Sequence, residues 1–260
     1  MSLTKTPPEI EKLKRGGERL SAILREVREA CVPGVGTAEL DALARARMAE
    51  IGAKPSFLGY RISDEDPPFN GALCTSLNEE VVHGLPHPNR IIQAGDVVGL
   101  DIGMWFEGLA TDMATTVIPG GTFDKKKAQL VADTREALVR GIGAIKAGGW
   151  IHDIGAAVED FVKPKGYGIV RDLVGHGVGH AVHEEPNVPN FRDTFLPRQR
   201  LLEGTVLAIE PMITLGTWKV RTKRDGWTVV TADGSPCAHF EVSVVVTKDG
   251  YELITPWPDA

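Results

Sequence analysis

The stretch from residue 97 to residue 117 constrains the fold more than any other part of the chain. It reads VVGLDIGMWFEGLATDMATTV, two apolar, β-branched runs on either side of Glu107-Gly108. Glu-Gly resembles the Asp-Gly and Asn-Gly pairs that favour tight turns, so the stretch predicts a β-hairpin. A two-residue loop would place Gly103 opposite Asp112 in the register of the two strands.

Two aspartates would then share one face of this hairpin. Strand side chains alternate between faces, and Asp101 lies two residues before Gly103, so Asp101 and Asp112 are expected as diagonal neighbours. Their Cα atoms would be roughly 7–8 Å apart, where two carboxylates repel unless they are protonated, solvated or joined by cations. The alternative is an ordinary hairpin with two solvent-facing aspartates. Residues elsewhere in the chain distinguish the two interpretations.

Composition narrows the classes of protein to which the chain can belong. Its 260 residues are 42% hydrophobic and 25% charged, enough for one large domain or two halves that share a core. A net charge of −6 without a long basic run argues against nucleic acid as the main partner. Three scattered cysteines predict neither disulfides nor a zinc knuckle. The sequence shows neither a signal peptide nor an apolar run of about 18 residues, so we expect a cytoplasmic protein without a membrane partner.

The expected elements alternate between helix pairs and strands. Apolar residues at helical spacing after Thr6-Pro7-Pro8 predict a helix that ends at Pro33-Gly34, and Thr37 is expected to cap a second helix. The pattern then predicts strands over 72–76 and 80–82, helices over 124–146 and 151–162, and strands over 205–213, 228–231 and 240–247.

A faint repeat links the two parts of the chain. The same offset of 114 residues separates Gly34 from Gly148 and Gly52 from Gly166, and a long helix precedes each of the first glycines. We interpret this as two similar α/β halves packed together, with a site expected in the seam between them. Chance similarity between amphipathic helices is the alternative.

Histidines cluster in residues 174–186, which read VGHGVGHAVHEEP. The glycines make a regular helix costly, so His176 and His180 are not expected to form a helical zinc pair. An extended chain would place His176 and His180 on one face and His183 on the other, unless a glycine bends it. One lone histidine would more often be structural, whereas three within eight residues favour a ligand or catalytic role.

Two glutamates stand next to apolar runs that are expected to be buried strands. A charged side chain buried there would need a partner. Glu210 ends the run Val206 to Ile209, and Glu241 opens the run before Val246. Placement at a surface edge is the alternative for each. Together with Asp101, Asp112 and His176 they supply four carboxylates and one imidazole, which two divalent cations would balance. This oxygen-rich set suits Mn, Fe, Co or Zn, and paired metals of this kind activate water and polarise a carbonyl.

The order of these residues resembles that of the pita-bread metallopeptidases, and within them the short bacterial form of the type I methionine aminopeptidases. The resemblance covers nearly the whole chain, and its carriers are PSFLGY (55–60), SLNEEVVHG (76–84), DIG (101–103), GHGVG (175–179), HEEP (183–186) and IEP (209–211). It implies an α+β pita-bread fold: two pseudo-symmetric α/β halves, roughly 8–120 and 121–260, in a single catalytic domain 1–260, with a curved antiparallel sheet and the site between the halves.

The resemblance also implies roles for the clustered residues. Asp101 would chelate one of two divalent metal ions, His176 and Glu210 would bind the other, and Asp112 and Glu241 would bridge them. An activated water would attack the scissile carbonyl, with Glu210 as proton shuttle. His83 would face the leaving side of the peptide, and His183 the carbonyl and the tetrahedral intermediate. A pocket for methionine would be lined by Phe57, Tyr60, Phe69, Cys74, Val182 and Trp227.

The function implied is removal of the initiator methionine from nascent polypeptide N-termini when the second residue is small, by a monomer working near the ribosome. A proline-directed aminopeptidase and a non-catalytic binding protein of the same fold are the alternatives. Only 26 residues (184–209) separate His183 from Glu210, which leaves no room for the insertion of type II enzymes, and no upstream domain is expected.

The sequence also departs from the family pattern. The loop RISDEDPP (61–68) lacks the usual glycine and tyrosine, and His239 and Val242 replace the usual glutamine and histidine around Glu241. These replacements could change the hydrogen bonds behind the metal ligands. His180 is left without a role.

Overall fold

The computed structural model describes residues 3–259, so both ends of the predicted domain 1–260 lie outside the described residues. The helices are α1 (Pro7–Ala30), α2 (Thr37–Glu50), α3 (Lys125–Gly143) and α4 (Ile151–Val162), followed by the short 3-10 helix η1 (Lys163–Lys165). The strands are β1 (Lys54–Pro55), β2 (Leu73–Leu77), β3 (Glu80–Val82), β4 (Val98–Phe106), β5 (Leu109–Val117), β6 (Gly168–Ile169), β7 (Gly175–Gly177), β8 (Glu184–Val188), β9 (Val206–Ile209), β10 (Met212–Thr214), β11 (Val220–Thr222), β12 (Val229–Thr231), β13 (Cys237–His239), β14 (Glu241–Val246) and β15 (Tyr251–Leu253).

A nine-stranded antiparallel sheet forms the centre of the molecule. Its main path runs β1-β4-β5-β14-β9-β7-β8, with β2 paired to β4 and β15 paired to β14. Two three-stranded sheets, β13-β10-β6 and β11-β12-β3, complete the fold. The central sheet therefore passes without a break from strands of the first half of the chain to strands of the second half at the β5–β14 pair.

The hairpin predicted from residues 97–117 is confirmed as β4 and β5. Gly103 lies opposite Asp112 in the register, and Asp101 lies opposite Ala114, so the two aspartates are diagonal neighbours on one face. The turn residues Glu107-Gly108 have φ of 49° and 83°, the left-handed geometry that two-residue hairpin turns favour.

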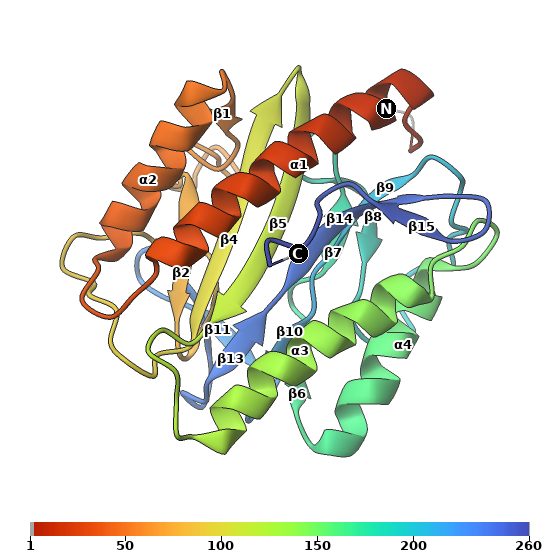
Figure 1. Ribbon diagram of the computed structural model, residues 1–260. Helices are drawn as coiled ribbons and strands as arrows, with labels where there is room; N and C mark the ends of the chain where they lie inside the picture. The colour runs from red at the N-terminus through yellow and green to blue at the C-terminus, as the bar shows by residue number, and fades with distance from the viewer. Residues whose placement is uncertain (1–2, 260) are drawn as a thin grey trace.

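The two faces of the sheet differ in character because strand side chains alternate. On one face, Leu100 and Ile102 of β4 pack with residues of α1 and α2, and Val242 and Val244 of β14 pack with residues of α3 and α4. Figure 1 shows α1 crossing in front of the sheet and α3 lying beside the C-terminal strands. The acidic residues between these apolar positions must point to the opposite face, away from the helices.

The helix pairs match the repeat expected from sequence. Gly34 and Gly148 follow the long helices with φ of 95° and 80°, and Gly52 and Gly166 follow the shorter ones with φ of 70° and 78°. Equal backbone geometry at a constant offset supports two related halves over chance similarity. The α+β class, with two similar α/β halves and an antiparallel sheet, is confirmed.

Several expected boundaries were wrong, and three of them concern more than a shift by one residue. Thr37 is the first residue of α2 instead of its cap, and its hydroxyl accepts a hydrogen bond from the backbone N–H of His87. The expected strand 205–213 is two strands, β9 and β10, because Pro211 lacks the N–H that a continuous ladder needs. Helix α3 ends at Gly143, three residues before the expected end.

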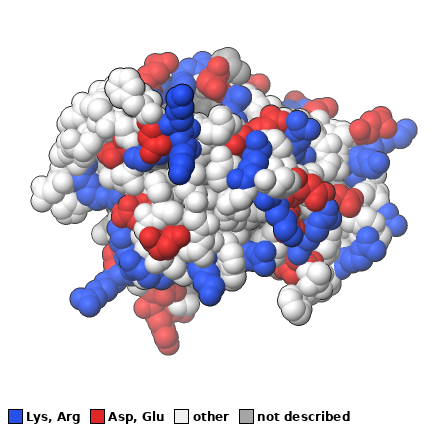
Figure 2. Space-filling model, turned by 90° about the horizontal axis from the view of Figure 1, so that it is seen from below, with Lys and Arg blue, Asp and Glu red and all other residues white. Residues whose placement is uncertain are grey.

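Both signs of charge are interspersed over the face of the molecule shown in Figure 2, in keeping with the modest net charge of −6. None of the helices in the described part of the chain has the length and apolar content that crossing a bilayer requires.

Candidate metal centre

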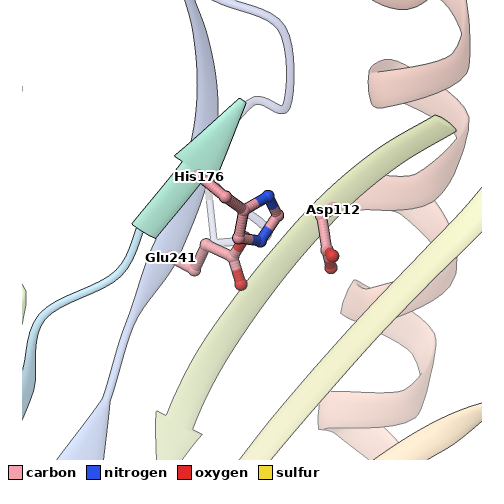
Figure 3. A group of neighbouring side chains, drawn as sticks. All are labelled: Asp112, His176 and Glu241. Carbon is pink, nitrogen blue, oxygen red and sulfur yellow. The ribbon is translucent and has the colours of Figure 1, made fainter. Parts of the chain in front are cut away.

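Five predicted ligands come together on the face of the sheet opposite the helices. Asp101 lies on β4, Asp112 on β5 and His176 on β7, while Glu210 directly follows β9 and Glu241 opens β14. Figure 3 shows Asp112, His176 and Glu241 close together, carried by three strands of the central sheet: β5, β7 and β14. Donor atoms of these three residues all lie within 4.8 Å of one another, which is the reach of ligands on a shared cation.

Burial disfavours the charged form of the four carboxylates unless nearby positive charge compensates them. Asp101, Asp112 and Glu241 are 8%, 3% and 3% exposed. Desolvation raises the pKa of Asp101 to about 7 and that of Glu210 to about 8, and it raises the pKa of Asp112 and Glu241 well above their ordinary range. Neighbouring carboxylates contribute to the raised pKa of Asp101, Asp112 and Glu241. Divalent cations would supply the positive charge that this cluster lacks.

Several buried donor and acceptor atoms in this cluster have no partner among residues 3–259. They include Oδ1 of Asp101, Oδ1 of Asp112 and Oε1 of Glu241. Leaving such oxygens unsatisfied costs free energy, and carboxylate oxygens with an imidazole nitrogen are the donors that Mn, Fe, Co and Zn accept. The residues therefore fit a site for divalent metal.

The orientation of His176 also fits a metal ligand. The Gly177 carbonyl lies 2.9 Å from Nδ1 of His176 and accepts its N–H, which leaves the lone pair on Nε2. That Nε2 lies 3.5 Å from Oε1 of Glu210. Burial and the neighbouring His183 lower the pKa of His176 to about 3, so the imidazole is neutral and free to coordinate.

The histidine-rich segment bends, so its three histidine side chains do not point in the directions that an extended strand would give them. Gly179 has φ of 137°, where a side chain would be strained. His180 turns toward α1, and its Nε2 lies 2.7 Å from Oε1 of Glu9. The rings of His176 and His183 approach to 4.3 Å between centroids. The segment is therefore not an uninterrupted extended chain, and the exception allowed for a bend at a glycine applies: His183 lies at the metal centre and His180 lies away from it.

A buried ion pair fixes the far end of this bend. Lys5, whose side chain is fully buried, pairs with Glu184, the residue after His183. The other carboxylate oxygen of Glu184 accepts the N–H of Ala181 at 3.2 Å. Lys5, just before α1, and Glu9, in the first turn of α1, thus hold the chain on both sides of His183.

We expect Lys5→Met to destabilise the protein by about 3 kcal/mol, because it leaves the carboxylate of Glu184 without its buried cation. Urea unfolding monitored by circular dichroism measures the change. The double variant Lys5→Met/Glu184→Gln is the control and should recover most of the loss. A single variant within about 0.5 kcal/mol of wild type would contradict this role for the pair.

A cavity of about 260 Å³ opens beside the metal centre. Five of the six residues expected for the methionine pocket line it, whereas the sixth, Val182, belongs to the same apolar cluster as Phe57, Phe69 and Trp227 without lining the cavity. Four further apolar residues line the cavity from loops and from β3, and none of them was predicted as a pocket residue: Ile62, Val82, Leu173 and Val174. The cavity therefore has one apolar side and one side made of the carboxylates and histidines.

Both predicted substrate-facing histidines line this cavity. Burial lowers the pKa of His83 to about 4 and lowers the pKa of His183. Nδ1 of His183 lies 2.9 Å from the hydroxyl of Tyr60, whose own pKa is raised by burial. A protonated hydroxyl that donates to Nδ1 leaves the imidazole proton on Nε2. The atypical loop 61–68 is tied to the pocket, since Nε1 of Trp227 donates to the Pro67 carbonyl at 2.9 Å.

Comparison with known proteins identifies the family to which the chain belongs. Residues 11–248 match the model of metallopeptidase family M24. The chain is 44% identical over 250 residues to a methionine aminopeptidase of Borreliella burgdorferi, with 96% of each chain covered. It is 42% identical over 249 residues to one of Aquifex aeolicus, covering 95% of this chain and 96% of the relative.

Solved structures give the same picture at the level of the fold. A crystal structure of methionine aminopeptidase from Thermotoga maritima superposes with a TM-score of 0.91 at 42% identity, covering 97% of this chain and 98% of that one. An Xaa-Pro dipeptidase from Bacillus anthracis superposes with a TM-score of 0.76 at 26% identity, and only 62% of its length is covered. The expected pita-bread fold is confirmed.

Proposed function

The chain belongs to metallopeptidase family M24, and we propose that its five clustered donors hold two divalent cations for peptide hydrolysis. It is a methionine aminopeptidase, a hydrolase that removes N-terminal methionine. The observation that carries the proposal is the convergence of buried, unpartnered carboxylate oxygens on one wall of an apolar cavity. Co, Mn, Fe and Zn all suit the donor set, which consists of Asp101, Asp112, His176, Glu210 and Glu241.

When bound, the cations would polarise the scissile carbonyl and lower the pKa of the attacking water. Glu210 stands at the edge of the cluster and lines the cavity, so it is placed to accept a proton from that water and pass it to the leaving amine. His183 directs Nε2–H toward the carbonyl oxygen, because the Tyr60 hydroxyl occupies Nδ1. His83 faces the leaving side. The apolar lining holds the methionine side chain, with Phe57, Tyr60, Phe69, Cys74 and Trp227 in its wall and Val182 in the same apolar cluster.

We propose that residues 1–260 act as one catalytic domain. Asp101 and Asp112 come from the first half (about 8–120), while His176, Glu210 and Glu241 come from the second (about 121–260). The β5–β14 pair joins these halves inside one sheet. Neither half has a complete ligand set, which supports a site that depends on both. The substrates would be the N-termini of nascent polypeptides near the ribosome, processed by a cytoplasmic monomer.

Peptide cleavage tests the function. Met-Ala-Ser should be hydrolysed with added divalent metal, whereas Met-Arg-Ser and Ala-Pro peptides should be cleaved at least about tenfold more slowly, since each tenfold is only 1.4 kcal/mol of transition-state binding. The reason is that an apolar cavity selects the first side chain, and the second residue must fit between His83 and His183. Release of methionine, measured by chromatography, gives the rates. Equal rates for Met-Ala-Ser and Met-Arg-Ser would contradict the size limit, and faster cleavage of Ala-Pro would favour the proline-directed alternative.

A further inference from the structure

His239 is a buried histidine beside the metal centre, and it belongs neither to the five-ligand set nor to the two substrate-facing histidines, His83 and His183. It ends β13 two residues before Glu241, and Phe240 between them points into the apolar cluster behind the sheet. Because side chains alternate along an extended chain, His239 and Glu241 therefore point to the same side. His239 is only 3% exposed, and its Nε2 has no hydrogen-bond partner among the described residues.

The unpartnered nitrogen is aimed at two of the carboxylates. Nε2 of His239 lies 3.6 Å from Oε2 of Glu210 and 4.0 Å from Oε2 of Glu241. The first distance nearly equals the 3.5 Å between Nε2 of His176 and the other oxygen of Glu210. Each carboxylate oxygen of Glu210 thus faces one imidazole, and the two nitrogen–oxygen distances are nearly equal.

These distances are those of ligands on a common cation. They exceed the range of a hydrogen bond to a carboxylate. Donors that each lie about 2.0–2.2 Å from one ion are about 3.4 Å apart at a tetrahedral angle and about 4.2 Å apart on opposite sides. The donor atoms of Glu210, His239 and Glu241 all lie within 4.8 Å of one another.

We propose that His239 is a further metal ligand, which joins Glu210 and Glu241 in holding one of the two cations. This inference rests on the proposed metal-dependent function. A second imidazole shifts the donor set toward nitrogen, so the site favours borderline metals such as Co and Zn over Mn more than five ligands would. The glutamine usual in the family cannot supply an imidazole nitrogen.

The test is Co²⁺ binding to the full-length, metal-free chain without substrate. X-ray absorption should count two imidazoles for each pair of Co²⁺ ions in wild type, and one in His239→Gln. Calorimetry should show one of the two Co²⁺ affinities falling by about 100-fold or more, the upper end of the loss that removing an outer partner of a ligand causes. His87→Gln, a histidine outside the site, is the matched control and should change neither value.

Three results separate the possibilities. One imidazole per pair of ions in wild type overturns the proposal whether or not the variant folds. Unchanged Co²⁺ affinity and imidazole count in His239→Gln also overturn the proposal. That result would mean that residue 239 only donates a hydrogen bond to Glu210, which a glutamine can do as well as a histidine. Failure of wild type to bind Co²⁺ at all would instead contradict the proposed function.

Discussion

Asp112→Asn is expected to lose divalent metal and activity together. Asp112 is buried, its Oδ1 has no partner, and its donor atoms lie within reach of His176 and Glu241. The amide keeps the shape of the side chain and removes one of the four charges that attract the cations. Because bound cations contribute several kcal/mol to the transition state, kcat/KM should fall by about 10³-fold or more. Asp101→Asn should behave in the same way.

Metal analysis and peptide kinetics on the same preparations measure this effect. The thermal midpoint without metal should stay equal or rise, because burial and the neighbouring carboxylates raise the pKa of Asp112, so that this group opposes folding of the metal-free protein at neutral pH. The gain in midpoint on adding metal should shrink. Asp64→Asn, on the exposed loop 61–68, is the control. An Asp112→Asn protein with normal metal content and activity would refute the proposed ligand set.

His183→Ala is expected to lower kcat by about 10²–10³-fold, the usual cost of losing one donor to a developing oxyanion. Metal content and KM should change little, because His183 lies outside the ligand set and its proposed contact forms in the transition state. His176→Ala should instead lose metal affinity. The two rings lie 4.3 Å apart, so the pair compares a ligand with a substrate-facing group at nearly the same place.

Metal stoichiometry and steady-state kinetics on both variants separate the two roles, with His87→Ala as control. Loss of a metal ion from His183→Ala would assign it to the ligand set. Retention of near wild-type kcat would remove it from the reaction altogether.

Local chemistry explains why the hairpin and its aspartates could be predicted. The turn at Glu107-Gly108 fixes the register, and alternation along β4 and β5 then fixes the faces of Asp101 and Asp112. Glu241 was identifiable because a charge beside a run of buried residues needs a partner. In these cases the deciding interactions lie within a few residues of the chain.

The bend that delivers His183 depends on contacts that no short segment contains. Lys5 and Glu9, more than 170 residues earlier, hold Glu184 and His180. A sequence can show that Gly179 permits a bend but not which direction it takes. The same holds for Leu173 and Val174: they directly precede the GHGVG motif, but nothing in the sequence indicates that their side chains line the cavity.

Anomalous diffraction from crystals grown with Mn²⁺ would show whether the five clustered residues hold two cations. We predict two anomalous peaks, one beside Asp101 and one beside His176 and Glu210, with Asp112 and Glu241 between them. Crystals that contain Mn²⁺ but show no ion between Asp101, Asp112 and Glu241 would contradict the claim.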